Sequence, residues 1–573
     1  MPTITVHRQD LEALMTAPGG AAESPALEQV EAWLALVKGE LKGHNPDTGE
    51  LRIELQDSNR PDLWCCEGIA RQIRIKRQGK SNLYAWSNQR PEGAIPRLEV
   101  MPGLETMRPY AAACIAVGHR ITDEGLTQLI QTQEKLADIF GRKRRTVSIG
   151  LYRLPRITFP VTYGLVAPDE FRFTPLGMDT MMTPAEILMV HPKGLEYGNI
   201  LAGHDRVPLL RDAKGLVLSF PPIINSRDVG EVQIGDSELF VEVTGTDIRM
   251  VVLTLNILAA NLADRGAAVT PVAVHYPADT ELGRTCVTPM NFAEPRTIPL
   301  AVIEAALGEP LGMEAVSSSL TSYGYEVKAG EASVTVQLPF YRNDFLHAVD
   351  VVEDVAISRG YGAFAPVMPS QFTVGNLSRV EQLADRVRDL MVGMEFQEIM
   401  ANIMGSRADL CGRMRVEGTP WGRLVEVDNV MSQSYACLRQ WIMPSLLHVE
   451  AASSRAFYPH RLFEVGEVAV PDEGADVGSR TITALGALIA HAQAHFSELH
   501  SCLDLLLYYL NCPYELRALD HPTFLSGRVG SIVSNGKTVG LLGEIHPEVL
   551  EQWQIGMPAV ALELDLQRLL ENL

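Results

Sequence analysis

The stretch LFVEVTGTDIRMVVLTLNILAANLAD, residues 239–264, places a strand, a tight turn and a long apolar helix in direct succession. Leu239 to Val243 is rich in β-formers, and Ile248 to Asp264 has the length and composition of a buried helix. Gly266 follows, and glycine commonly ends a helix at this position. A strand that turns directly into a helix indicates mixed α/β architecture for this part of the chain.

The same stretch carries a candidate polar pocket. Glu242 interrupts the apolar strand, so its carboxylate points either into an apolar interior or to the solvent face. Thr244, Gly245 and Thr246 precede the helix, where backbone N–H groups stabilise an oxyanion or a phosphate. The alternative is ordinary helix capping with Glu242 on the surface. Spacing alone leaves both interpretations open.

A group of carboxylates forms a second candidate site. On a helix that begins near Ala348, the side chains of Asp350, Glu353 and Asp354 lie on one face. Asp344 lies in the short segment just before this helix. Hard oxygen donors suit Mg²⁺, which takes one or two carboxylates and keeps several waters. The alternative is an acidic, solvated helix face or a complement to the helix dipole.

The composition bounds the class of protein. A length of 573 residues and a mass of 62.9 kDa predict about four domains, at roughly 150 residues each. With 46% hydrophobic and 21% charged residues, disorder and fibrous structure are excluded. The net charge of −21 excludes a surface mostly covered by nucleic acid, but not a local contact. No apolar run approaches the ~20 residues that cross a bilayer. The cysteines are scattered and form no Cys-x-x-Cys pair. We therefore expect a cytoplasmic protein with free thiols.

Two basic runs are candidates for such a local contact. Each is either a solvated surface loop or a contact with phosphate groups. The runs are Arg71, Arg74, Lys76, Arg77 and Lys80, and Arg142-Lys143-Arg144-Arg145.

The N-terminal half contains further predicted elements. Pro25 to Lys42 predicts a helix, and Asp62 is expected to cap a helix that reaches Arg77. Thr183-Pro184 predicts the start of another helix, because threonine caps well and proline suits the first helical position.

The C-terminal half begins after residues 276–297, whose Pro and Thr content predicts a linker. From Leu300 to Ser358, the order helix, helix, strand, helix is typical of a small winged-helix-like module. Ser378 begins a capping box and a helix, and Phe396 to Met404 is strand-like. The remaining residues alternate strands and helices, which predicts a mixed sheet flanked by helices.

Seven segments resemble one family, the β subunit of phenylalanyl-tRNA synthetase in its archaeal/eukaryotic form. They occur in the family's order, and the chain length fits this shorter form. The segments are DSNRPDLW (57–64), HPKGLEY (191–197), SFPPIINS (219–226), FVEVTGTD (240–247), YRND through GY (341–361), RLFEVG (461–466) and GLLGEIHP (540–547).

The resemblance implies a domain plan and a partner. It implies a B1-like domain at 1–88, a B3/B4-like editing domain at 89–275, a winged-helix-like B5 domain at 290–368, and a class II synthetase-like antiparallel-sheet core at 370–573. It also implies an α2β2 tetramer in which the α subunit binds ATP and phenylalanine and charges tRNA-Phe. Arg461 to Glu464 resemble the ATP-binding strand, but no Gly-x-Gly-x-Glu-Arg follows near the C-terminus. We therefore expect no phenylalanine activation by this chain alone, since that arginine would hold the terminal phosphates.

The resemblance further implies hydrolytic editing of Tyr-tRNA-Phe and a structural Mg²⁺ near the α contact. Glu242 would accept the tyrosine hydroxyl. The implied editing residues are Glu242, Asn225, Thr244, Gly245 and Thr246, and the implied metal ligands are Asp344, Asp350, Glu353 and Asp354. Ile149-Gly150-Leu151-Tyr152-Arg153 departs from the family pattern, which continues with Ile-Gly and a His-Asp pair. This departure keeps open a rival hypothesis, a non-editing scaffold or regulatory paralogue that only binds partners.

Overall fold

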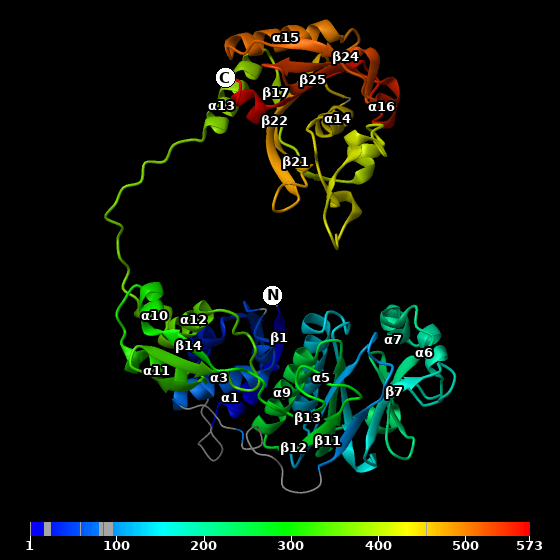
Figure 1. The fold of residues 1–573 in the computed structure, drawn as a ribbon, viewed down its shortest axis with the longest axis vertical. Coiled ribbons are helices and arrows are strands. Elements are labelled where there is room, and N and C mark those ends of the chain that lie inside the picture. Colours follow the sequence, from blue (N-terminus) through cyan, green and yellow to red (C-terminus); the bar gives the residue numbers. More distant parts are fainter. Residues whose placement is uncertain (1, 17–24, 58, 80–83, 85–94, 454) are drawn as a thin grey trace. The chain divides into compact units, whose positions relative to one another are not determined.

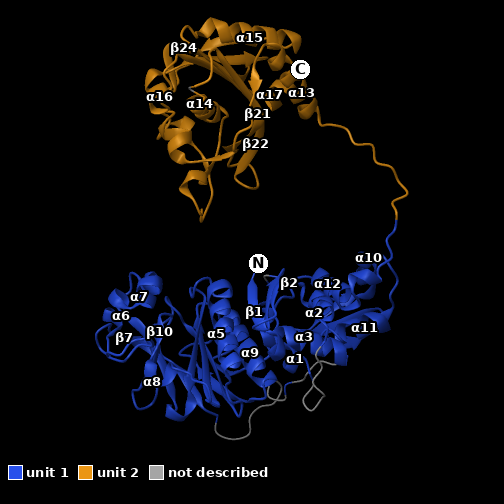
Figure 2. Ribbon diagram, turned by 180° about the vertical axis from the view of Figure 1, so that it is seen from behind, with its two compact units in different colours: residues 1–367 blue, residues 368–573 orange. Residues whose placement is uncertain are grey.

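The computed structural model describes residues 2–16, 25–57, 59–79, 84, 95–453 and 455–573. Ser58, Lys80 and the expected domain boundary at residues 88 and 89 lie outside the described residues. The chain divides into two compact units, residues 1–367 and 368–573 (Figure 2).

The first segment of unit 1 packs helices against a small antiparallel sheet in the order β1-β3-β2 (Figure 1). Its elements are β1 (Thr3–His7), α1 (Arg8–Met15), α2 (Leu27–Leu34), β2 (Gly39–Asn45), β3 (Glu50–Leu55) and α3 (Cys66–Gln78). The predicted helix from Pro25 to Lys42 is therefore wrong in its second half. Lys38 adopts a left-handed conformation with φ 48°, which ends the helical turn, and the chain enters β2, where pairing with β3 outweighs local helical pattern.

The helix predicted to reach Arg77 is confirmed as α3, but its predicted cap is wrong. Cys65 caps α3, because its Sγ accepts a hydrogen bond from the Gly68 N–H at 3.4 Å. Asp62 instead accepts two hydrogen bonds from the Arg60 guanidinium, at 2.8 and 2.9 Å.

The second segment of unit 1 is built on a long mixed sheet in the order β10-β9-β8-β7-β4-β12-β5-β11-β6, with β13 paired to β12. Helix α9 packs against β5 and β11. The strands are β4 (Arg97–Val100), β5 (Tyr110–Val117), β6 (Val147–Arg153), β7 (Val161–Val166), β8 (Val207–Arg211), β9 (Val217–Phe220), β10 (Ile224–Asn225), β11 (Glu238–Gly245), β12 (Ala268–His275) and β13 (Thr285–Thr288). The helices are α5 (Asp123–Lys135), α6 (Pro184–Val190), α7 (Pro192–Tyr197), α8 (Arg227–Gly230) and α9 (Ile248–Asp264).

Two of the predicted helices in this segment are confirmed. α9 has the predicted bounds, and Thr183 caps α6 in a capping box with Glu186. The predicted linker at 276–297 is wrong in part, because β13 lies within it and pairs antiparallel with β12. Polar, Thr-rich sequence suits an edge strand as well as a loop.

The third segment of unit 1 confirms the predicted order of helix, helix, strand and helix. It consists of β14 (Arg296–Pro299), α10 (Leu300–Leu307), α11 (Met313–Thr321), β15 (Glu326–Ala329), β16 (Ser333–Gln337) and α12 (Ala348–Arg359). The sheet order is β14-β16-β15, and the helices share a separate apolar core with it. Strands β14 and β15 were not predicted.

Unit 2 contains a sheet in the order β17-β21-β22-β26-β25-β24-β23, antiparallel except where β17 meets β21. Successive residues of β22 enter two different apolar cores, so the sheet is covered on both faces. The strands are β17 (Gln397–Glu398), β18 (Met404–Gly405), β19 (Val425–Glu426), β20 (Cys437–Leu438), β21 (His460–Pro471), β22 (Ser479–Ala490), β23 (Glu515–Ala518), β24 (Phe524–Ser534), β25 (Lys537–Ile545) and β26 (Ala559–Asp565). The helices are α13 (Arg379–Gly393), α14 (Met443–Ala452), α15 (Phe496–Tyr509), α16 (Pro547–Gln552) and α17 (Leu566–Leu570).

The predicted start of unit 2 is confirmed only in part. Ser378 caps α13 by accepting a hydrogen bond from the Glu381 N–H, which is the first half of the predicted capping box. The strand predicted from Phe396 to Met404 is reduced to short β17 and the first residue of β18. Among the described residues, no helix is both long and apolar enough to cross a membrane.

Candidate functional site

A cavity of about 270 Å³ lies beside β11 in unit 1. Its walls come from α5, the basic turn after it, β6, α7 and the segment around β9 and β10. The lining includes Gln133, Arg144, Ser148, Gly150, Tyr197, Ser219, Asn225 and Glu242. Asn225 and Glu242, predicted from the sequence, thus line one cavity.

Glu242 is buried, with 2% of its surface exposed, so the solvent-face alternative is wrong. Its Oε2 accepts a hydrogen bond of 2.8 Å from the Tyr152 hydroxyl, which also lies 2.8 Å from Ser219 Oγ. Among the described residues, Oε1 of Glu242 has no hydrogen-bond partner. Burial raises the pKa of Glu242 to about 7, against the lowering effect of the Tyr152 hydrogen bond.

Gly150 is required beside this carboxylate. It pairs with Glu242 across β6 and β11. A Cβ at Gly150 would lie 2.0 Å from the Tyr152 hydroxyl and 2.5 Å from Glu242 Oε2. Only glycine leaves the space in which the two side chains meet.

The structure does not place Thr244, Gly245 and Thr246 in the cavity lining, within the described chain. The Thr244 hydroxyl lies 2.9 Å from Ser148 Oγ, and the Thr246 N–H donates to the Thr146 carbonyl at 3.0 Å. Asp247 caps α9 through the Met250 N–H. The capping alternative therefore describes this turn, because its helix-entry groups already have partners inside the fold.

The second basic run forms a strained turn at the cavity. Arg142, Lys143 and Arg144 have positive φ angles of 49°, 55° and 63°. Arg144 lines the cavity, stacks on Tyr197 at 4.4 Å and donates to two backbone carbonyls of the segment before β10. The sequence did not predict that this run and Glu242 share a site.

Arg108 is a further structural residue that the sequence analysis missed. Its buried guanidinium donates to the carbonyls of Arg144, Arg145 and Thr244 and to Ser148 Oγ. It thereby ties the basic turn to β11. No motif marks it, because its partners are remote in sequence.

The first basic run has a structural role where it is described. Arg71 and Arg74 are buried and both form ion pairs of 2.6 Å with Asp264. Lys76 donates to two serine hydroxyls, at 3.1 and 2.9 Å. These side chains join α3 to neighbouring elements rather than forming a solvated loop.

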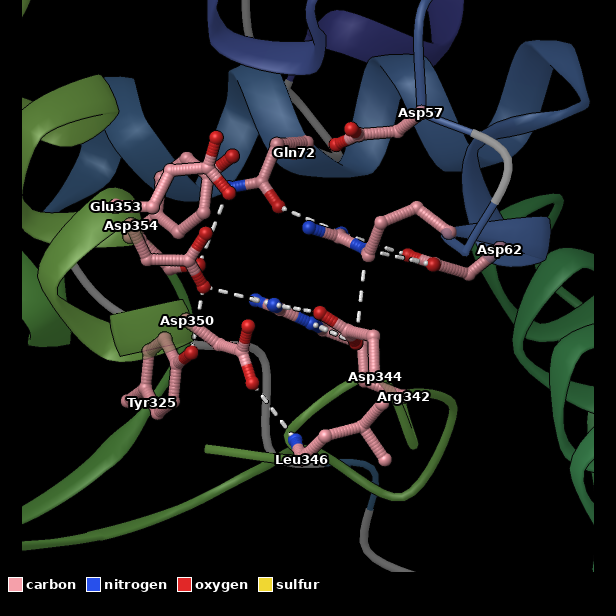
Figure 3. A network of polar contacts seen from close by, with 12 residues as sticks. Asp57, Asp62, Gln72, Tyr325, Arg342, Asp344, Leu346, Asp350, Glu353 and Asp354 are labelled. Carbon is pink, nitrogen blue, oxygen red and sulfur yellow. Dashed lines mark hydrogen bonds and ion pairs between the residues drawn. The ribbon is translucent and has the colours of Figure 1, made fainter. Parts of the chain in front are cut away.

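The four predicted metal ligands lie around one buried arginine (Figure 3). Arg342 donates to Asp344 at 2.9 and 2.6 Å and to Asp354 at 2.7 Å. Arg60 lies 3.9 Å from Asp344. Although burial opposes it, the charge of the two arginines holds the pKa of Asp344 at about 2.

The other two carboxylates have separate partners. Asp350 accepts hydrogen bonds from the Leu346 and His347 N–H groups at 2.8 and 2.7 Å, and Glu353 pairs with Lys38 at 2.6 Å. The expectation that Asp350, Glu353 and Asp354 converge on one point is therefore wrong for the chain alone. In the described part of the chain, no group of three or more His, Cys, Asp or Glu residues is placed to hold a metal ion. The protein's own cations and amides already engage at least one oxygen of each carboxylate, and the four side chains do not converge on one point. As folded, these residues therefore do not fit a resident Mg²⁺, and we derive no step through one.

In unit 2, the strand that resembles an ATP-binding strand is engaged internally. Arg439 donates to Glu464 at 3.0 and 2.7 Å, and Arg461 pairs with Glu498 at 3.0 Å. A cavity of about 560 Å³ lies on the same sheet, and its lining includes Trp421, Trp441, His521 and Glu563. Burial raises the pKa of Glu563 to about 8.

Comparison with protein families places both units in one class. Residues 296–361 match the family described as the tRNA synthetase B5 domain, and residues 365–566 match the phenylalanyl tRNA synthetase beta chain CLM domain. The fold is thus that of a multidomain aminoacyl-tRNA synthetase subunit.

Full-length relatives identify the family. The phenylalanine–tRNA ligase beta subunit of Treponema pallidum subsp. pallidum is 39% identical over 98% of this chain and 93% of the relative. That of Borrelia garinii subsp. bavariensis is 37% identical over 95% of this chain and 96% of the relative. The chain belongs to the phenylalanine–tRNA ligase beta subunit family, and it is a ligase subunit. Since these relatives are bacterial, the expected archaeal/eukaryotic type is not confirmed.

A solved structure is also similar. The N-terminal fragment of the phenylalanyl-tRNA synthetase beta-subunit from Pyrococcus horikoshii has 34% identity and a TM-score of 0.58. The match covers 63% of this chain and all of that fragment.

Proposed function

We propose that this chain works with an α subunit in the ATP-dependent attachment of phenylalanine to tRNA-Phe, and that it hydrolyses Tyr-tRNA-Phe in the cavity beside Glu242. The names of its relatives support the ligase role. The observation that carries editing is a buried carboxylate at a cavity, with one oxygen that has no partner among the described residues.

The chemistry explains why such a cavity is needed. A hydrophobic amino-acid pocket rejects an added hydroxyl only about 10²-fold. A second pocket that accepts the phenolic hydroxyl supplies the missing discrimination. A buried polar site of this kind disfavours phenylalanine, which leaves the carboxylate unpaired.

Within the cavity, each residue has a defined task. Glu242 accepts the phenolic O–H of the esterified tyrosine, and the Asn225 amide orients the ester. Water breaks the ester bond to release tyrosine and tRNA, and no covalent intermediate on the protein is required. The basic turn from Arg142 to Arg145 neutralises phosphates of the tRNA end that brings the ester to the cavity.

The proposal extends to the assembly. The aminoacylation site, with its ATP and phenylalanine, lies on α in a cytoplasmic α2β2 tetramer. Unit 2 is a class II synthetase-like core without synthetic chemistry. This is supported by the ion pairs that engage Glu464 with Arg439 and Arg461 with Glu498 inside the fold. The division at 1–88, 89–275, 290–368 and 370–573, and the archaeal/eukaryotic type, are part of this proposal. Full coverage of the Pyrococcus fragment supports the type.

Substitution Glu242→Ala in the α–β complex tests the proposal. Phenylalanine charging is expected to stay unchanged, while Tyr-tRNA-Phe, normally cleared, persists. Glu238→Ala, an exposed position at the start of the same strand, is the matched control. Unchanged clearance of Tyr-tRNA-Phe by Glu242→Ala would refute the assignment.

A non-editing scaffold is the second candidate. It is favoured by the Tyr152 hydrogen bond, which occupies one oxygen of Glu242, and by the exclusion of residues 244–246 from the lining. It predicts that the wild-type complex charges phenylalanine but does not hydrolyse Tyr-tRNA-Phe. The same assay therefore separates the two candidates.

A further inference from the structure

Tyr152 stands at the position where the sequence departs from the family pattern, and its side chain meets the buried carboxylate. Tyr152 pairs with Phe240 across β6 and β11, and Gly150 pairs with Glu242. The Tyr152 hydroxyl therefore reaches diagonally over Gly150 to Glu242. The close approach is possible only because Gly150 has no side chain.

Tyr152 approaches Glu242 from the apolar core rather than from the cavity. Its ring is fully buried and packs against Phe240, with ring centroids 5.9 Å apart. The cavity lining, within the described chain, includes Gly150, Ser219 and Glu242 but not Tyr152. Tyr152 thus does not fill the space that a substrate would occupy.

The hydrogen-bond pattern gives the two carboxylate oxygens different roles. A phenol has one proton, so Tyr152 donates it to Glu242 Oε2 and accepts a hydrogen bond from the Ser219 hydroxyl. Oε1 is left buried without a partner among the described residues. An unpaired buried acceptor is costly, and a ligand hydroxyl relieves that cost.

We infer that Tyr152 is a positioning residue for substrate specificity: it fixes Glu242 through Oε2 and so reserves Oε1 for the phenolic hydroxyl of a tyrosyl ester. This inference rests on the proposed editing function and assigns a new role within it. On this basis the departure at Tyr152 is a different way of orienting the same glutamate.

The charge state of Glu242 depends on the groups that face it. These are Tyr152 on β6, Tyr163 on β7 and Arg108 before β5; Ser148, Ser219 and Thr244 contribute only neutral hydroxyls. Burial raises the pKa of Glu242, whereas the hydroxyls of Tyr152 and Thr244 and the charge of Arg108 lower it. Loss of the Tyr152 hydroxyl is therefore expected to raise this pKa further.

The test is Tyr152→Phe in the assembled α–β complex, with hydrolysis of Tyr-tRNA-Phe and Phe-tRNA-Phe measured across pH. We expect the preference for the tyrosyl ester to fall about 10-fold, mainly through KM, because a hydrogen bond to a charged group is lost. The pH profile of tyrosyl ester hydrolysis should move to higher pH. Tyr276→Phe is the matched control, since this buried tyrosine directly after β12 donates to the Ala111 carbonyl of β5.

A second variant keeps the inference testable if Tyr152→Phe fails to fold. Replacement of Tyr152 by 3-fluorotyrosine keeps the hydroxyl and makes it more acidic, so the pH profile should move in the opposite direction, to lower pH. Unchanged specificity and unchanged pH profiles in both variants would overturn the inference while leaving editing intact. A wild-type complex that charges phenylalanine but never clears Tyr-tRNA-Phe would overturn the proposed function itself, and this inference with it.

Discussion

Two groups of buried carboxylates in unit 1 differ in what surrounds them. Asp344 and Asp354 share the guanidinium of Arg342, with Arg60 close by. Glu242 has a neutral phenol on one oxygen and no partner among the described residues on the other. The first group is neutralised by the protein and braces the fold. The second keeps an acceptor for a ligand, at a cost in stability.

The largest expected effect comes from breaking the neutralised group. Arg342→Met leaves two buried carboxylates without their main cation, which should lower the free energy of unfolding by about 3–5 kcal/mol. Urea unfolding, with hydrogen exchange of α12 as a local measure, checks this. The control is Arg359→Met, whose ion pair with Glu309 is partly exposed and should contribute under about 1 kcal/mol. Equal effects of the two variants would contradict the role assigned to Arg342.

A second prediction uses the opposite pKa shifts of Glu242 and Asp344. The pKa of Glu242 is raised from 4.5 to about 7, so its stabilising contribution is full below pH 4.5 and is lost as pH rises through 7. Glu242→Gln should therefore stabilise the chain by about 3 kcal/mol at pH 8, with little effect at pH 4. Hydrogen exchange of β6 and β11 across pH measures it.

The pH dependence of the Asp344 contribution to stability is expected to be the opposite of that of Glu242. Its pKa is lowered to about 2, so its contribution is present above the unfolded pKa and is lost as pH falls through 2. Asp344→Asn should remove acid sensitivity only below about pH 4. A Glu242→Gln effect that does not depend on pH would show that the carboxylate is not the cause.

The smallest expected effect concerns the magnesium prediction. Glu353 pairs with Lys38 near the surface, so Glu353→Gln should cost under about 1 kcal/mol in the chain alone. Millimolar Mg²⁺ or a chelator should leave the thermal unfolding temperature of this chain unchanged, because the carboxylates already have partners. A Tm increase of several degrees with Mg²⁺ would contradict this and restore the predicted site.

Charge reversal Glu353→Lys then extends the test to the assembly. If a metal at these residues helps to hold α, the reversal and the chelator should both weaken tetramer formation. An assembly indifferent to both would leave the carboxylates a purely internal role.

Local elements were predictable where pattern and packing agree. α9 has the predicted bounds because its apolar sequence is long, has a cap at its start and is followed by Gly266. The Leu300 to Ser358 module was recognised from the order of its helices and strand. The helix from Pro25 to Lys42 failed at Gly39, where a strand partner decided the conformation.

The types of the site residues were predictable from the sequence, but whether their side chains are free to bind a metal ion was not. The i, i+3, i+4 spacing of Asp350, Glu353 and Asp354 indicated one shared face. In the fold, Asp350 turns back to the helix N-terminus, while the other two meet Lys38 and Arg342. Spacing along a helix does not report which cations arrive from elsewhere in the chain.

The amino-acid sequence by itself indicated the family and several of the local helices, and the family resemblance singled out Glu242 and Asn225 as candidate pocket residues. Tertiary structure alone decided that Tyr152 and Gly150 frame Glu242, that the basic turn lies at the same cavity, and that Arg342 takes two of the four carboxylates. The physical reason is that burial and pairing set the charge of a side chain and decide which of its polar atoms still lack a hydrogen-bond partner. Both depend on neighbours that are remote in sequence.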